Sequence, residues 1–259
     1  MSTLLLRRDE DGVLHVTLNR PEVRNAMSLA MVGELHDALR SAEADGSTRV
    51  VVLRGAGGHF CAGADLKDMA ASRAASSEAL AETNARFGRL CVAFSRTPLA
   101  LVAVLEGTVM GGGFGLACVA DVAIAGESAQ LRLPEVSLGV VPAQIGPFLV
   151  ERLGYAEAKR LAISAARLDA RQALALRLVH EVCVDAELDA ALARTLQTLR
   201  QCAPGAVSAT KALLAKARFA SPESLVQEAA DVFARAAQGP EGIEGTSAFL
   251  QKRKAAWAA

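Results

Sequence analysis

The chain changes character about halfway along its length, because apolar strand-like runs alternating with helical patterns give way to helical patterns alone. Gly12 to Leu18 alternates in polarity, and Val50 to Leu53 and Leu99 to Leu105 are short apolar runs, so all three predict strands. Between the first two, residues 28–44 repeat apolar side chains at helical spacing, with Ser28 as the candidate N-cap. Strands alternating with helices predict a layered α/β core.

The second half, from Glu151 onward, is predicted to be mostly helical. Residues 70–85, in contrast, are rich in alanine and serine without a sharp apolar period, so we expect a mobile loop or a loosely held helix there, which could act as a lid. With 259 residues and 52% hydrophobic content, the chain can bury one compact domain with a modest appendage. The segments with helical spacing are Ala156–Ile163, Asp169–Leu176, Leu188–Leu199, Val207–Ala217 and Pro222–Ala237.

Composition argues against several classes of partner. Lysine plus arginine (28) equals aspartate plus glutamate (28), and aromatic residues are only 4%, so we expect no nucleic-acid partner. No apolar stretch reaches the roughly 20 residues of a membrane helix, and the first ten residues fit neither a secretory leader nor a transit peptide. Five widely spaced cysteines without a C-x-x-C pair are typical of reduced thiols. We therefore expect a cytoplasmic protein that does not bind membranes.

The segment HFCAGADL, residues 59–66, follows the strand predicted at 50–53 and leads into a helix expected to begin near Leu66. Its small residues let a ligand approach the main chain closely. The free N–H groups at a helix start also favour a negatively charged oxygen. An ordinary strand-to-helix turn with Asp65 as N-cap explains the same residues equally well.

The segment EGTVMGGGFGLA, residues 106–117, lies between the strand predicted at 99–105 and an apolar helical pattern. Three consecutive glycines before a helix cost chain entropy unless something must lie against them. A phosphate loop is excluded because no Gly-Lys-Ser/Thr follows, and the glycine spacing does not match the dinucleotide fingerprint. A role in tight helix packing stays open beside a role in ligand binding.

The segment AQLRLPEVSLGVVP, residues 129–142, carries one carboxylate in apolar surroundings. Glu135 is preceded by Pro134 and followed by Val136 and Leu138, so burial is expected to raise its pKa and to suit it to proton transfer near neutral pH. A glutamate after a proline is also common as a first helical residue or a turn residue. This segment alone therefore does not decide the function.

Taken together, FCAGADL, GTVMGGGFGLA, ADVAIA and LPEVSLGVVP resemble the enoyl-CoA hydratase/isomerase (crotonase) family, from about Val13 to the C-terminus. The resemblance implies an α/β fold with a crotonase-like spiral of β-β-α units over residues 1–195. It implies a helical C-terminal region over residues 196–259 that covers the CoA site and builds homotrimers or dimers of trimers. It also implies an acyl-CoA substrate with no metal and no separate cofactor, since coenzyme A is part of the substrate.

By the same resemblance, the backbone N–H groups of Ala64 and Gly112 form an oxyanion hole for the thioester oxygen, and Glu135 moves protons. Preorganised donors stabilise charge that develops in the transition state, and losing one typically costs about 2.7–4 kcal/mol. Lys211 or Lys252 is expected near the CoA phosphates. The implied substrate- and CoA-binding residues are Arg24, Ala26, Ala62, Asp65, Leu66, Gly111, Pro134 and Ala143.

One position departs from the family pattern, because Gly115 stands where hydratases of the family generally carry a second glutamate. Two branches tolerate a single carboxylate there. One comprises enoyl-CoA isomerases, and the other comprises hydratases of 3-substituted glutaconyl-CoA esters such as 3-methylglutaconyl-CoA or isohexenylglutaconyl-CoA. Gly115 and the stretch PAQIGPF, residues 142–148, favour the second branch, with Ala143 and Gln144 bordering the water site. The cations available for a distal substrate carboxylate are Arg132, Lys67 and Arg86.

Other polar residues are assigned structural roles. Asp121 is expected to bond to nearby loops, and Cys61 to pack as a small residue because no motif places a histidine to activate it. Glu106 could face the pocket or end a strand at the surface. A CoA-sensing or RNA-binding protein that kept the fold is the alternative from another class. No metal-ligand spacing links the histidines His15, His36, His59 and His180.

Overall fold

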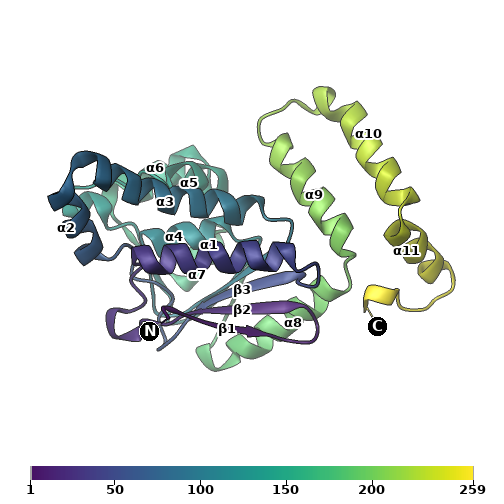
Figure 1. Cartoon of the computed structure of the whole chain (residues 1–259), viewed down its shortest axis with the longest axis horizontal. Coiled ribbons are helices and arrows are strands. Elements are labelled where there is room, and N and C mark those ends of the chain that lie inside the picture. The colour runs from purple at the N-terminus through teal and green to yellow at the C-terminus, as the bar shows by residue number, and fades with distance from the viewer. Residues whose placement is uncertain (1, 259) are drawn as a thin grey trace. The chain divides into compact units, whose positions relative to one another are not determined.

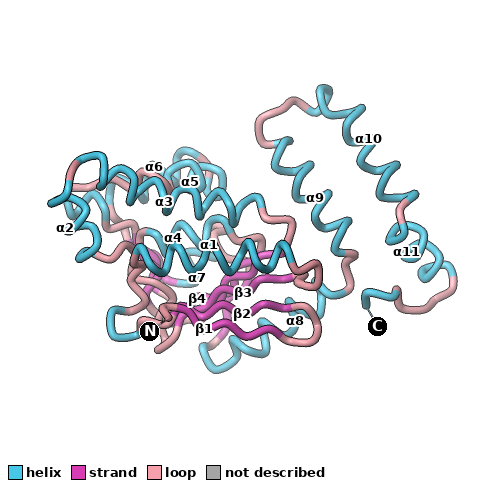
Figure 2. Tube along the Cα trace, viewed as in Figure 1, coloured by secondary structure: helices cyan, strands magenta, loops and turns pink. Residues whose placement is uncertain are grey.

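The computed structural model describes residues 2–258 and is built around a six-stranded sheet of order β1-β2-β3-β4-β6-β9 (Figures 1 and 2). β2 and β3 pair in parallel, as do β4 and β6, whereas β1 runs antiparallel to β2. The three strands predicted from sequence are β2, β3 and β4. The strands of this sheet are β1 (Leu4–Arg8), β2 (Val13–Leu18), β3 (Val50–Gly55), β4 (Ala100–Leu105), β6 (Val122–Gly126) and β9 (Glu181–Cys183).

A second, three-stranded sheet holds β5 (Thr108–Met110), β7 (Gln130–Arg132) and β8 (Arg167–Asp169). From β4 to β7, successive strands alternate between the two sheets, as in the β-β-α arrangement expected of the spiral. β5 pairs in parallel with β7, with Met110 opposite Arg132. The segments that leave these two strands therefore start side by side.

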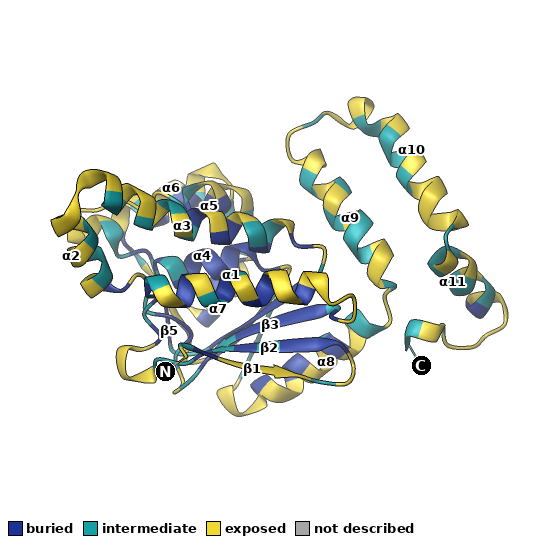
Figure 3. Ribbon diagram, viewed as in Figure 1, coloured by how far each residue is buried: buried dark blue, intermediate teal, exposed yellow. Residues whose placement is uncertain are grey.

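Helix α1 (Leu29–Ala44) confirms the helix predicted over residues 28–44. Ser28 caps it, because its hydroxyl accepts a hydrogen bond from the Met31 N–H at 3.2 Å. The apolar stripe of α1 packs inward, and every residue of β4 is buried, so the core lies between this helix layer and the long sheet (Figure 3). The buried residues of α1 are Met31, Val32, Leu35, Ala38, Leu39 and Ala42.

Of the two alternatives for residues 70–85, the mobile loop is wrong and the helix is confirmed, because the chain there forms α2 (Leu66–Ala75) and α3 (Ser77–Arg96). Asp65 caps α2 by accepting the Lys67 N–H at 2.9 Å. The Ser76 hydroxyl accepts the Ala79 N–H at 3.0 Å at the start of α3. α2 buries none of its residues, whereas α3 is anchored by an apolar stripe that begins beyond residue 85. That stripe comprises Gly88, Leu90, Cys91 and Phe94.

The remaining helices of the core follow the small sheet and the glycine-rich segment. The helices predicted over residues 156–163 and 169–176 are α6 and α7. Strands β8 and β9 interrupt the region after Glu151, which the sequence predicts to be mostly helical. These helices are α4 (Gly112–Val119), α5 (Gly146–Leu153), α6 (Tyr155–Ser164), α7 (Ala170–Ala175) and α8 (Leu188–Arg200), with 3-10 turns at Pro21–Val23, Glu135–Leu138 and Asp185–Glu187.

The chain divides into two compact units, one of residues 1–95 and 101–192 and the other of residues 96–100 and 193–259. The second unit contains residues 193–200 of α8, together with α9 (Pro204–Ala217), α10 (Pro222–Gln238), α11 (Pro240–Leu250) and a terminal turn at Ala256–Ala258. It is held internally by Lys211, whose ammonium donates to the Leu99 carbonyl at 2.6 Å. Among the described residues, no helix is both long enough and apolar enough to cross a bilayer.

Candidate active site

The two glycine- and alanine-rich segments run side by side at the edge of the small sheet. Cys61 and Val109 form a parallel bridge. The Cys61 N–H donates to the Thr108 carbonyl and the Met110 N–H donates to the Cys61 carbonyl, both at 2.9 Å. A Cβ added at Gly63 would lie 3.2 Å from the Met110 oxygen, so the two main chains are in contact there. Ala64 comes directly after Gly63 in the chain, and Gly112 lies two residues after Met110, so their peptides lie next to this contact.

The Glu135 carboxylate lies over Gly111, one residue before the start of α4. A Cβ added at Gly111 would lie 2.9 Å from Glu135 Oε1. Gly111 also has φ +50° and ψ −115°, a backbone conformation that residues with side chains rarely adopt. Its N–H donates to the Arg132 carbonyl at 3.1 Å, which holds the glycine segment against β7. Glycine is therefore required here both by conformation and by the carboxylate above it.

Glu135 is a half-buried carboxylate whose hydrogen-bonding capacity is not filled. Its Oε2 is buried and has no hydrogen-bond partner among the described residues. Burial raises the pKa of the Glu135 carboxyl, and a hydrogen bond from its own backbone N–H opposes this in part. Buried polar atoms normally have partners, so an unfilled acceptor with a raised pKa marks a candidate for proton transfer.

The position of the second family carboxylate is filled by an apolar side chain. A Cβ added at Gly115 would lie 2.3 Å from Ile145 Cγ2 and 3.7 Å from Phe87 Cζ. Ile145 is 3% exposed, so this methyl group is part of the core and cannot move aside freely. The Phe87 ring also lies 3.2 Å from a Cβ added at Gly112. This side of α4 therefore presents hydrocarbon where a second glutamate would stand.

The stretch 142–148 is fastened to α3 beside the same position. Gln144 Nε2 donates to Asn84 Oδ1 at 2.8 Å. A Cβ added at Gly88 would lie 2.0 Å from Gln144 Oε1, so the Gln144 side chain packs across this glycine. That Gln144 borders the water site stays a prediction, and its amide is bonded to α3. Ala143, just before it, is exposed.

The residues predicted to bind coenzyme A come from two segments that the structure brings together. The Ala62 N–H donates to the Arg24 carbonyl at 2.9 Å, and the Asp65 N–H donates to the Met27 carbonyl at 3.0 Å. Ala26 lies within this paired stretch, and Leu66 is exposed as the first residue of α2. The remaining predicted residues, Gly111 and Pro134, lie beside Glu135.

Arg20 belongs to the same network and was not found from the sequence. Its guanidinium Nη1 donates to the Ala26 carbonyl at 2.6 Å and lies 2.8 Å from Asp65 Oδ2. It therefore ties both paired segments together next to Ala64. No spacing rule could have signalled this role, since Arg20 and Asp65 are far apart in sequence and meet only in the fold.

The residues set aside in the sequence have structural contacts. Asp121 Oδ2 accepts the Leu101 N–H at 2.8 Å, and Glu106 lies 3.5 Å from Arg54 in an ion pair. Cys61 is fully buried, and burial raises the pKa of its thiol to about 12, which leaves it protonated and unreactive. The described residues hold no group of three or more side chains suited to a metal ion.

Comparison with known proteins shows the family of the chain. A sequence model of the family described as "Enoyl-CoA hydratase/isomerase" matches residues 8–259. The chain belongs to this family. Within the family, proteins named as enoyl-CoA hydratases are carbon–oxygen lyases, and the chain is accordingly an enzyme of the enoyl-CoA hydratase/isomerase type with an acyl-CoA substrate.

Individual relatives of this enoyl-CoA hydratase/isomerase cover nearly its whole length. The 2,3-dehydroadipyl-CoA hydratase of Escherichia coli is 34% identical over 98% of this chain and 97% of its own. A peroxisomal Delta(3,5)-Delta(2,4)-dienoyl-CoA isomerase of Arabidopsis thaliana is 31% identical over 96% of this chain and 94% of its own. The solved structure of Pseudomonas aeruginosa AtuE is 56% identical, covers 99% of this chain and 100% of its own, and superposes with a TM-score of 0.97.

Proposed function

We propose that this enzyme is a hydratase that adds water across the 2,3 double bond of a 3-substituted glutaconyl-CoA. The observation that carries the proposal is the half-buried carboxylate of Glu135, which lies over Gly111, has an unfilled Oε2 and has no second glutamate opposite it at Gly115. In the proposed complex, the N–H groups of Ala64 and Gly112 bind the thioester oxygen. Negative charge develops on that oxygen when the double bond is attacked, so these donors bind the transition state more tightly than the substrate.

Glu135 performs both proton transfers in this mechanism. As its carboxylate takes a proton from water, the hydroxide oxygen bonds to C3, and the electrons of the double bond move onto the thioester as an enolate. The protonated Glu135 then returns the proton to C2 and is regenerated. Hydroxyl at C3 and hydrogen at C2 account for the atoms of the water. A pKa raised by burial suits a group that must accept and return a proton near neutral pH.

The apolar surface beside Gly115 favours a substrate that is branched at C3. Ile145 and Phe87 supply hydrocarbon at the place of the second carboxylate. A methyl or longer alkyl group at C3 would gain apolar contact there, whereas a second polar group would remain unsolvated. An unbranched 2-enoyl-CoA would leave this contact unused, and we expect it to be a poorer substrate.

A distal carboxylate on the substrate is supported by the name of one relative. The Escherichia coli relative is called a 2,3-dehydroadipyl-CoA hydratase, and its name describes the CoA ester of a dicarboxylic acid. Of the three candidate cations, Arg132 already donates its Nε to the Ala165 carbonyl at 2.8 Å. Arg86 precedes Phe87 on α3, and Lys67 lies in the first turn of α2. Arg86 and Lys67 are therefore the cations to replace first.

A comparison of three substrates tests the proposed reaction. The purified enzyme is incubated separately with 3-methylglutaconyl-CoA, a straight-chain 2-enoyl-CoA and a 3-enoyl-CoA, and the products are followed by mass. We expect a gain of one water with 3-methylglutaconyl-CoA and a much slower gain with the straight-chain ester. The Glu135→Gln variant should bind the esters without turnover, while the Glu10→Gln variant, changed at an exposed residue, should match the wild type.

Double-bond migration is the second candidate reaction. It is favoured by the single carboxylate, which can shuttle a proton between two carbons without water, and by a relative named as a dienoyl-CoA isomerase. Products of unchanged mass from the 3-enoyl-CoA, with no hydrated product from any substrate, would reject the hydratase proposal. No turnover of any ester together with tight binding would indicate the CoA-sensing alternative.

Assembly into homotrimers or dimers of trimers stays a prediction. Large apolar side chains are exposed on the C-terminal unit, as expected for helices that pack against other subunits. Phe219, Phe233 and Phe249 are 82%, 74% and 83% exposed. Sedimentation equilibrium of the intact chain would give the subunit number directly, and a monomer at micromolar concentration would contradict the prediction.

A further inference from the structure

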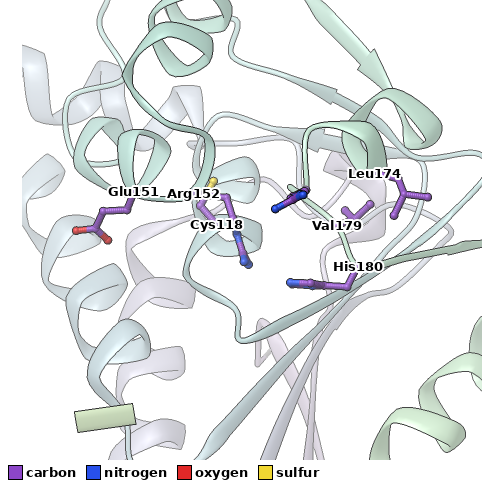
Figure 4. A pocket seen from close by; sticks show the side chains of 7 residues that line it. Cys118, Glu151, Arg152, Leu174, Val179 and His180 are labelled. Atoms are coloured by element: carbon purple, nitrogen blue, oxygen red, sulfur yellow. The ribbon is translucent and has the colours of Figure 1, made fainter. Parts of the chain in front are cut away.

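A cavity of about 580 Å³ lies at the end of α4 opposite Gly112, away from the contacts of Glu135 (Figure 4). All of its lining residues belong to the core unit. Its polar lining is rich in nitrogen donors, and its apolar lining could hold an organic group. The donors are Arg152, Arg177 and His180, and the apolar residues are Cys118, Leu174 and Val179.

Arg152, which extends from α5 into this cavity, has an unused donor. Its Nη2 donates to the Ala120 carbonyl at 2.5 Å and to the Ala117 carbonyl at 3.3 Å, where α4 ends. Its Nε is buried and has no hydrogen-bond partner among the described residues. A positively charged guanidinium in the wall of the cavity favours a ligand that carries negative charge.

His180 offers a second donor, and its hydrogen bond with Ala123 shows which ring nitrogen carries the proton. Its Nδ1 accepts the Ala123 N–H at 2.9 Å, so the neutral ring carries its proton on Nε2. In Figure 4 the side chains of His180 and Arg152 extend toward the same space, whereas Glu151 points away from it. The cavity therefore presents N–H donors, and its one lining carboxylate is turned aside.

We propose that this cavity is a second binding site, which takes an organic phosphate monoester. The donors come from two parts of the chain, namely α5, which carries Arg152, and the connection between α7 and β9, which carries Arg177 and His180. A tetrahedral phosphate can accept hydrogen bonds from such different directions, and guanidinium groups bind its oxygens well. The volume exceeds that of a phosphate group alone and lies in the range of small-molecule sites, so the organic part lies against Leu174 and Val179.

Calorimetric titration with phenyl phosphate tests the site, with inorganic phosphate and phenol as separate titrants. We expect phenyl phosphate to bind more tightly than inorganic phosphate, and phenol not to bind. Arg177→Gln and His180→Asn should each weaken phenyl phosphate binding by about tenfold or more, since each removes a donor to a charged oxygen. Asparagine at position 180 can still accept the Ala123 N–H, so the fold is preserved.

Arg171→Gln is the matched control, because Arg171 lies on the neighbouring α7, is 80% exposed, and pairs with Glu127 outside the cavity. It removes the same charge as Arg177→Gln and should leave the affinity unchanged. The ¹⁵N signal of the His180 ring, assigned by its loss in His180→Asn, should shift on addition of phenyl phosphate. Absence of binding, equal weakening by Arg171→Gln, or a His180 signal that does not move would each overturn the proposal.

Discussion

Adding one methyl group at Gly115 tests whether Ile145 occupies the place beside α4. Replacement of a helical glycine by alanine ordinarily stabilises a protein by about 0.8–1.0 kcal/mol. At Gly115, however, the new Cβ would lie 2.3 Å from Ile145 Cγ2, and such overpacking typically costs about 1–3 kcal/mol. At Gly33 in α1, no atom lies within 4 Å of an added Cβ. Gly115→Ala should therefore be less stable than Gly33→Ala by about 1–3 kcal/mol.

The assay is urea unfolding followed by circular dichroism, at one protein concentration because association adds to apparent stability. Variants at Ile145 identify the clashing atom. Ile145→Leu moves the branch away from Cβ and removes Cγ2, so Gly115→Ala should be better tolerated in that background. Ile145→Val removes only the terminal methyl and keeps the clash, so it should give no such relief. Equal stabilisation by Gly115→Ala and Gly33→Ala would refute the packing described here.

Three further predictions follow from other contacts. Burial raises the pKa of Glu135, so the native state holds its proton more tightly than the unfolded chain does. Stability should therefore fall as the pH rises from the ordinary carboxyl pKa of 4.5 through the raised pKa. In thermal melts, the Glu135→Gln variant should lose this decline and exceed the wild type at pH 8 but not at pH 4. Arg20→Ala should lower kcat/KM several-fold by releasing Asp65, with partial recovery in Arg20→Lys, whereas equal activity would dismiss the positioning role. In native protein at pH 8, iodoacetamide should label the exposed Cys202 and spare Cys61, because a thiol pKa of about 12 leaves Cys61 almost entirely protonated. Peptide mass spectrometry reports the labelled cysteines, and a labelled Cys61 would contradict the prediction.

Local patterns were sufficient for elements that are long or strongly periodic. The spacing of apolar residues predicted α1 together with its Ser28 cap, and the apolar runs predicted β2, β3 and β4. Strands β5, β7 and β8 have three residues each, which is too few for any period to show, and they form because neighbouring segments pair with them. The sequence could not decide between a loop and a helix over residues 70–85, because the buried stripe of α3 lies in its C-terminal half, beyond the alanine-rich stretch.

Some features of the candidate site can be predicted from neighbouring residues in the sequence, whereas others arise only from contacts between separate elements. The burial of Glu135 could be anticipated from its apolar neighbours in the sequence, and its position over Gly111 follows from the pairing of β5 with β7. The contact of Gly115 with Ile145 joins residues on separate elements, so the sequence could show a missing glutamate without showing what replaces it. The Arg20 contact with Asp65 is tertiary for the same reason.

The hydrocarbon beside Gly115 and the unfilled oxygen of Glu135 are consistent with one chemical requirement. In the proposed mechanism a single carboxylate must accept a proton from water and return it to carbon, so both of its protonation states must be accessible at the working pH. A second carboxylate at position 115 would repel the ionised form of Glu135 and raise its pKa further. Ile145 instead leaves burial to set the pKa, and the buried Oε2, to which none of the described residues donates, stays basic enough to take the proton.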